Sequence, residues 1–138
     1  MNPAFSFYAA AYGGAALVLS VLDVLWLWLV VGRLYRAELG SLMRTDVAMV
    51  PAVAFYLIYL VGVVVFAVMP AVASGGLQRA ALLGALLGFI AYCTYDLTNL
   101  ATLNGWPLKV AMLDIAWGTF ITALAAVGGT WAVRLLRD

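Results

Sequence analysis

The chain has 138 residues, of which 67% are hydrophobic and only 9% are charged. This composition excludes an ordinary soluble domain and is typical of an integral membrane protein. A net charge of +1 creates no overall field that would attract nucleic acid, so we expect no nucleic-acid partner. Histidine is absent and Cys93 is the single cysteine, so the usual nitrogen and sulfur ligands are lacking, and we expect neither a metal nor a cofactor.

Four apolar runs organise the chain, and each is long enough to cross a hydrocarbon core of about 30 Å. They cover residues 5–32, 47–69, 80–103 and 108–133. Because the connections are short, we expect an all-α membrane protein with a four-transmembrane-helix antiparallel bundle, in a single integral membrane domain over residues 1–138. An even number of spans places both termini on one side of the membrane.

The first run carries a stripe of residues that must face protein rather than lipid. Tyr12, Asp23 and Trp26 belong to it, at spacings that share one helical face. The basic stretch that follows, residues 33–44, suits either a short helix in the membrane interface or a solvated loop with snorkelling arginines.

The second run is rich in aromatic residues along one helical face. Pro51 is tolerated in its first turn, and Phe55, Tyr56 and Tyr59 follow. We expect Pro70 to end this helix, because proline removes a helical hydrogen bond and obstructs the preceding turn.

The third run contains the most polar segment of the chain, residues 92–99. An aspartate at such depth costs at least about 2.5–3.5 kcal/mol to insert, so Asp96 needs partners. Tyr92 and Asn99 lie four residues before it and three after it, and we expect both to bond to its carboxyl. The threonines of this run are expected to bond back to their own helix.

The fourth run repeats a spacing found in the first. Asp114 and Trp117 are separated by three positions, as are Asp23 and Trp26. Two matched positions do not establish a repeat, but they indicate two similar sites that face each other.

These polar residues share one layer of the expected bundle. At the helical rise, Asp23, Asp96 and Asp114 lie roughly 14, 12 and 8 Å from the end formed by the first and third connections. No basic residue belongs to this layer, so the carboxyls must be protonated, hydrated or bound to a cation. The candidate binding or proton and cation site consists of Asp23, Asp96, Asp114, Tyr56, Tyr59, Tyr92, Asn99, Trp26 and Trp117.

Three functions are compatible with this site. The first is binding or translocation of a proton, a cation or a small solute. The second is a non-catalytic lipid-binding or membrane-complex assembly role, in which the aspartates only fix helix packing. The third is a membrane enzyme that uses paired carboxylates on a lipid-like substrate held between Trp26, Phe55 and Trp117. The lack of a strong nucleophile beside a base favours the non-enzymatic readings.

Two rows of small residues suggest how helices approach each other. Ala80, Gly84 and Gly88 form one row, and a second row runs over residues 118–126. A chain this short is small for a transporter, so we expect a homodimer built through one of these rows, or another membrane protein as partner.

The motifs together resemble a known family. Its pattern includes Asp23-x-x-Trp26, Pro51-Ala52-x-x-Phe55-Tyr56-x-x-Tyr59, Tyr92-x-x-Tyr95-Asp96-Leu97-Thr98-Asn99 and Asp114-x-x-Trp117-Gly118. The chain is similar over nearly its whole length to bacterial predicted membrane proteins that carry a domain of unknown function, number 2177. The resemblance implies a small multi-pass protein of the bacterial inner (plasma) membrane, and it implies no activity.

Overall fold

The computed structural model describes residues 3–137, and all of its regular elements in that range are helical. Four helical stretches are long and apolar enough to cross a membrane, as the sequence predicts. Their residue ranges are Phe5–Leu42, Met49–Ser74, Gly76–Thr102 and Leu108–Arg134. The protein is therefore an all-α multi-pass membrane protein.

The first span continues well beyond its predicted end. It consists of α1 (Pro3–Trp26), the π-helix η1 (Leu27–Tyr35), α2 (Arg36–Leu39) and the 3₁₀ turn η2 (Gly40–Leu42). Most of the basic stretch at 33–44 is thus a direct continuation of the first helix. The loop alternative was wrong for residues 33–42, because the wider π-helical turns carry the helix through Tyr35 without a break, and the helical alternative takes the form of a continuation of the first helix.

The second span also continues past the proline that was expected to end it. It consists of α3 (Met49–Val63), the π-helix η3 (Val64–Val68) and α4 (Met69–Ser74). Pro70 lies at the start of α4, where its missing N–H is tolerated because the π-helical turns before it have already changed the hydrogen-bonding register. The prediction that Pro70 ends the helix was therefore wrong.

The last two spans are uninterrupted helices. α5 covers Gly76–Thr102 and begins earlier than the predicted residue 80, and α6 covers Leu108–Arg134. At 27 residues each they are roughly 40 Å long, which exceeds the hydrocarbon core by about two turns.

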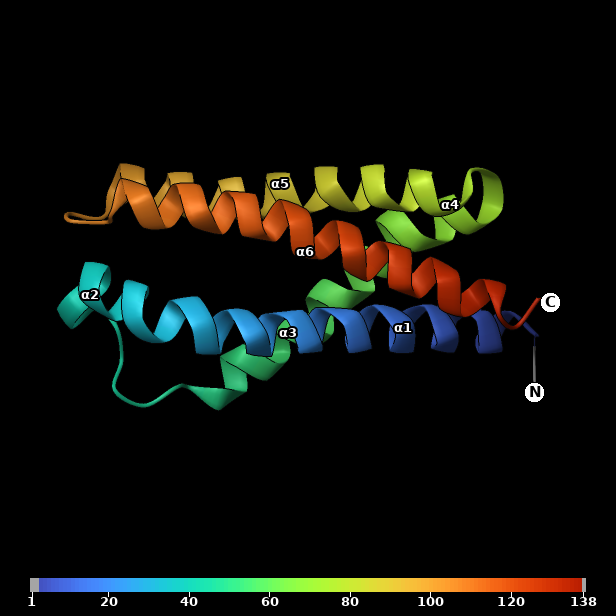
Figure 1. Cartoon of the computed structure of the whole chain (residues 1–138), viewed down its shortest axis with the longest axis horizontal. Helices are drawn as coiled ribbons and strands as arrows, with labels where there is room; N and C mark the ends of the chain where they lie inside the picture. Colours follow the sequence, from blue (N-terminus) through green and yellow to red (C-terminus); the bar gives the residue numbers. More distant parts are fainter. Residues whose placement is uncertain (1–2, 138) are drawn as a thin grey trace.

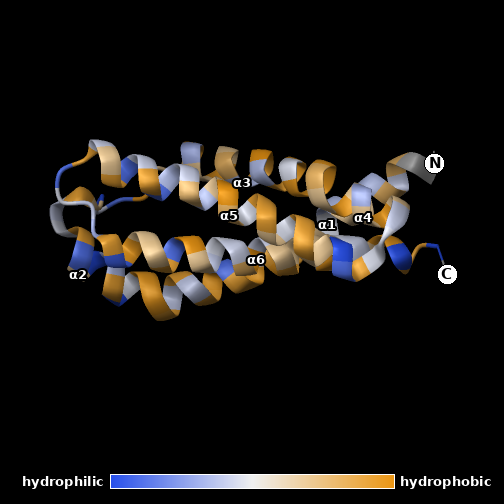
Figure 2. Ribbon diagram, turned by 90° about the horizontal axis from the view of Figure 1, so that it is seen from above, coloured by the Kyte–Doolittle hydropathy of each residue, from blue (hydrophilic) through white to orange (hydrophobic). Residues whose placement is uncertain are grey.

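The spans form an antiparallel bundle with both termini at one end (Figure 1). The turn between α4 and α5 lies at that end, while α2 and the turn between α5 and α6 lie at the other (Figure 1). Coloured by hydropathy, the helices are mostly apolar along their length and the most hydrophilic residues gather toward the two ends (Figure 2). The predicted topology is confirmed.

The two rows of small residues meet inside the chain. A Cβ on Gly84 would lie 2.7 Å from the Thr122 carbonyl oxygen, and one on Gly88 would overlap the Gly118 carbonyl oxygen. Gly84, Gly88 and Gly118 are all buried. Both rows are therefore used by the α5–α6 contact, and the expectation that either one builds a homodimer was wrong.

Replacing Gly88 by alanine should destabilise the bundle. The added methyl must push α6 away from α5, which should cost about 1–3 kcal/mol of unfolding free energy by overpacking. Gly13→Ala is the matched control, since a Cβ there meets nothing within 4 Å. Unfolding in detergent should show a loss for Gly88→Ala alone. Equal stability of the two variants would contradict the close α5–α6 approach.

Cysteine accessibility should reproduce the topology. In a Cys93→Ala background, Ser41→Cys and Asn104→Cys should react with an impermeant maleimide from one side of the membrane, and Ser74→Cys from the other. Labelling of Ser41→Cys and Ser74→Cys from the same side is incompatible with the bundle.

Candidate functional site

Asp23 is the acidic residue of α1. Its carboxylate accepts a hydrogen bond from the hydroxyl of Tyr56 on α3. Both side chains are half-buried. This bond joins the first span to the second, so the sequence correctly placed the two residues in one layer.

Asp114 has an equivalent partner that the sequence did not indicate. Its Oδ1 accepts a hydrogen bond from the hydroxyl of Tyr35, which is only 8% exposed. Tyr35 comes from η1, a segment expected to lie outside the bundle. Each of these two carboxyls therefore has a tyrosine from another span as its hydrogen-bond donor.

The two Asp-x-x-Trp motifs do face each other. The indoles of Trp26 and Trp117 stack with their ring centroids 4.4 Å apart and their planes at 5°. Tyr35 meets Trp26 edge to face at 6.4 Å. The two motifs face each other as their spacing indicated, and the stack links α1 to α6.

Asp96 differs from the other two aspartates. It is completely buried, and neither of its carboxyl oxygens has a hydrogen-bond partner among the described residues. The bonds expected from Tyr92 and Asn99 are therefore absent, and the ring of Tyr92 packs against Gly118 of α6 instead.

The indole N–H of Trp106 is close enough to act on the Asp96 carboxyl, yet it forms no hydrogen bond and is itself buried. The carboxyl of Asp96 and the indole N–H of Trp106, a hydrogen-bond donor, are therefore both left unbonded within residues 3–137, at the end of the layer nearest the α5–α6 turn. The threonines around Asp96 bond back to their own helix as predicted, with Thr94 donating to the Ile90 carbonyl at 2.7 Å.

Tyr59 on α3 and Tyr92 on α5 also belong to this layer, and both contact α6. A Cβ on Gly118 would overlap the ring of Tyr92, so the glycine is what allows this ring to lie against α6. The Tyr59 hydroxyl lies 2.7 Å from Oγ1 of Thr122. Asn99 is half-buried one turn beyond Asp96 and joins none of these bonds.

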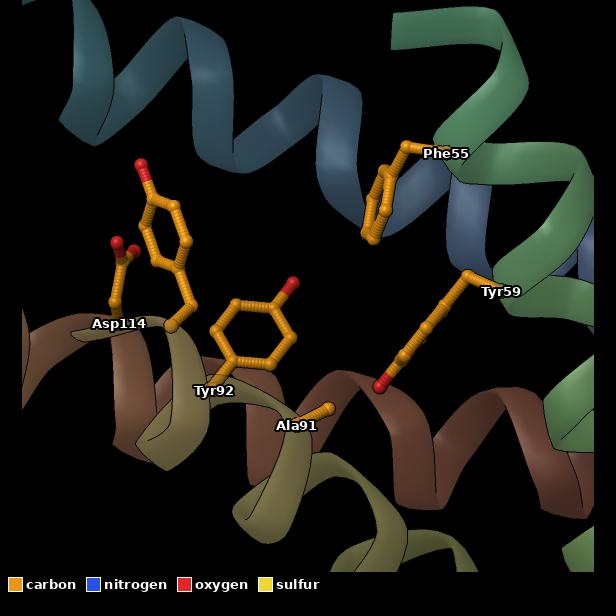
Figure 3. A pocket seen from close by; sticks show the side chains of 6 residues that line it. Phe55, Tyr59, Ala91, Tyr92 and Asp114 are labelled. Carbon is orange, nitrogen blue, oxygen red and sulfur yellow. The ribbon is translucent and has the colours of Figure 1, made fainter. Parts of the chain in front are cut away.

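A cavity of about 360 Å³ lies beside this layer. Its walls are formed by Phe55, Tyr59, Ala91, Tyr92, Tyr95 and Asp114. The side chains of Tyr92 and Asp114 point to the same side of α5 and α6, and Phe55 and Tyr59 reach the cavity from α3 (Figure 3). Ala91 and Tyr95 were not among the predicted site residues, although Tyr95 belongs to the polar segment 92–99, and a small residue such as Ala91 carries no signal of its own in the sequence.

Charges near the site are almost all acidic. The one ion pair within residues 3–137 joins Lys109 to Glu38 at 3.4 Å, outside the layer. No described basic side chain bonds to Asp23, Asp96 or Asp114. In the part of the chain that the structure describes, no three carboxylate, thiol or imidazole side chains gather closely enough to hold a metal ion.

The arrangement is suited to binding a cation. A carboxylate in a cavity walled by aromatic rings attracts a cation through its own charge, and the negative faces of the rings add to that attraction. A general acid and base pair would need two carboxyls at one reacting atom, whereas only Asp114 lines the cavity.

The comparisons with known proteins agree with the membrane fold. No curated protein and no solved structure matches the chain. The model of the family described as "Predicted membrane protein (DUF2177)" matches residues 8–131, which include every candidate site residue. The chain belongs to this family of predicted membrane proteins.

Proposed function

We propose that this protein binds a small organic cation within the membrane, as the first step of its translocation. Asp114 is the charge partner, and Phe55, Tyr59, Tyr92 and Tyr95 supply the aromatic walls. The observation that carries the proposal is a carboxylate that lines an aromatic cavity inside apolar spans without a basic partner. We further propose the bacterial inner membrane as its location, in line with the family resemblance.

The other two carboxyls leave Asp114 as the charge partner. Asp23 accepts a hydrogen bond from Tyr56, and neither Asp23 nor Asp96 lines the cavity. Tyr35 holds one oxygen of Asp114, and no described side chain bonds to the other, which leaves that oxygen for a ligand. A singly charged ammonium head matches a site that offers one free carboxylate oxygen and several ring faces.

One observation favours a second candidate, in which the aspartates serve only to assemble the bundle. The Tyr56–Asp23 and Tyr35–Asp114 bonds each join different parts of the chain. On this reading the carboxyls fix helix packing and the cavity holds lipid. Asp114→Asn separates the two functions, because the amide still accepts from Tyr35: packing alone predicts unchanged cation affinity, and cation binding at Asp114 predicts a loss of affinity.

Asp114→Asn should abolish most cation binding and leave the fold intact. Asparagine keeps the shape and can still accept from Tyr35, but the charge is gone, so affinity for tetramethylammonium should fall by at least about 30-fold, or about 2 kcal/mol. Isothermal titration of nanodisc-embedded protein measures this. Asp46→Asn, in the exposed loop before α3, is the control. Unchanged affinity in Asp114→Asn would remove the proposal.

Phe55→Leu should weaken the same binding by a smaller factor. Leucine keeps an apolar wall but removes the ring face, which at a half-open site is worth about 0.5–1 kcal/mol, or about two- to fivefold in affinity. Phe89→Leu, an exposed phenylalanine of α5 outside the cavity, should change nothing. If both variants bind like the parent protein, the rings do not hold the cation.

A further inference from the structure

The cavity is open along one side of the bundle. η3 and α4, in the second half of the second span, pack against α5, whereas α3 scarcely contacts α5. In Figure 1 the second span runs obliquely across the bundle, from the lower edge at α3 toward α5 at α4. Phe55 on α3 and Tyr95 on α5 both line the cavity and are 47% and 56% exposed. The cavity therefore opens between α3 and α5.

This opening lies within the membrane. Phe55 is six residues from the start of the second span and Tyr95 seven from the end of α5, which puts both roughly 9–11 Å from those helix ends. On the outer surface beside the opening, Ile58 of α3 is apolar and exposed, and the exposed Thr94 and Thr98 of α5 donate their hydroxyls to carbonyls of their own helix. The surface around the opening is thus the surface that lipid chains cover.

The route from the nearer loop end is obstructed. Tyr35 is buried and bonded to Asp114, so its side chain lies across the approach from α2. Asp96 and Val110 are fully buried on the α5 and α6 side. A ligand that reaches Asp114 has its most open path through the side of the bundle.

The chemistry of the site restricts which membrane-soluble ligand fits. A cavity of about 360 Å³ holds an ammonium head and a few methylenes, and a longer chain must leave through the opening. A phosphate beside the head would lie next to Asp114, where no described basic side chain is bonded to neutralise it. Ordinary phospholipid headgroups are therefore poor ligands.

We propose that the ligand is an amphiphilic amine, with its ammonium head at Asp114 and its hydrocarbon chain passing between α3 and α5 into the bilayer. This proposal rests on the cation-binding function proposed above and names the class of cation. The aromatic residues at the opening contact the first methylenes, Ile58 on α3 lies beside them, and lipid surrounds the rest of the chain.

A series of trimethylammonium ions with one methyl, butyl, octyl or dodecyl substituent tests the proposal on the unaltered protein. Equilibrium dialysis against protein-loaded nanodiscs measures the bound cation. Nanodiscs that carry Asp114→Asn give the amount dissolved in lipid, which is subtracted. Dodecyl sulfate and dodecylphosphocholine serve as probes of the same chain with an anionic and a phosphate-containing head.

We expect one Asp114-dependent site for every cation of the series, with an affinity that is at least tenfold higher for the dodecyl ion than for the methyl ion. Neither dodecyl sulfate nor dodecylphosphocholine should bind at this site. Binding that stops beyond the butyl ion would show a closed cavity for small cations, and would overturn this inference while leaving the proposed function in place. No Asp114-dependent binding of any cation would overturn both.

Discussion

Three carboxyl groups lie inside apolar spans without a basic side chain bonded to them, and the rest of the structure depends on how they are accommodated. Each costs at least about 2.5–3.5 kcal/mol to insert, so each needs hydrogen bonds or burial in protein. Tyr56 and Tyr35 supply donors to Asp23 and Asp114. These bonds draw α3 and η1 toward the α1–α6 pair, and the aromatic cavity forms beside them.

The close contact between α5 and α6 provides the rigid side of the site. Glycines on both helices let their backbones approach, and Gly118 makes room for the ring of Tyr92. α3 is attached to this pair much less closely. The wall formed by α5 and α6 is therefore fixed, whereas the wall formed by α3 is held chiefly by hydrogen bonds of tyrosine hydroxyls. Tyr56 bonds to Asp23 and Tyr59 to Thr122. The hydroxyl of Tyr12 donates to the Leu57 carbonyl at 3.3 Å.

The sequence predicts the spans, the topology and much of the layer, because hydropathy and helical spacing determine these features. The matching Asp-x-x-Trp motifs indicated that the two helices face each other there, and the structure adds the stack of Trp26 on Trp117. The sequence does not predict Tyr35 as a partner of Asp114, because the π-helical turns that place Tyr35 there have no clear signal in the sequence. Spacing also suggested Tyr92 as a partner for Asp96, but side-chain direction depends on the neighbouring helix: the Tyr92 ring packs against Gly118 of α6, and both Asp96 oxygens stay without a hydrogen bond from any described residue.

The most direct test of the account is whether a cation reaches the carboxyl of Asp114. Infrared difference spectra of the nanodisc-embedded protein, recorded with and without tetramethylammonium, report changes at individual carboxyl groups. We predict a carboxyl difference band that is retained in Asp46→Asn and lost in Asp114→Asn. A spectrum without any carboxyl band, or a band that survives in Asp114→Asn, would contradict the assignment of Asp114 as the cation's partner.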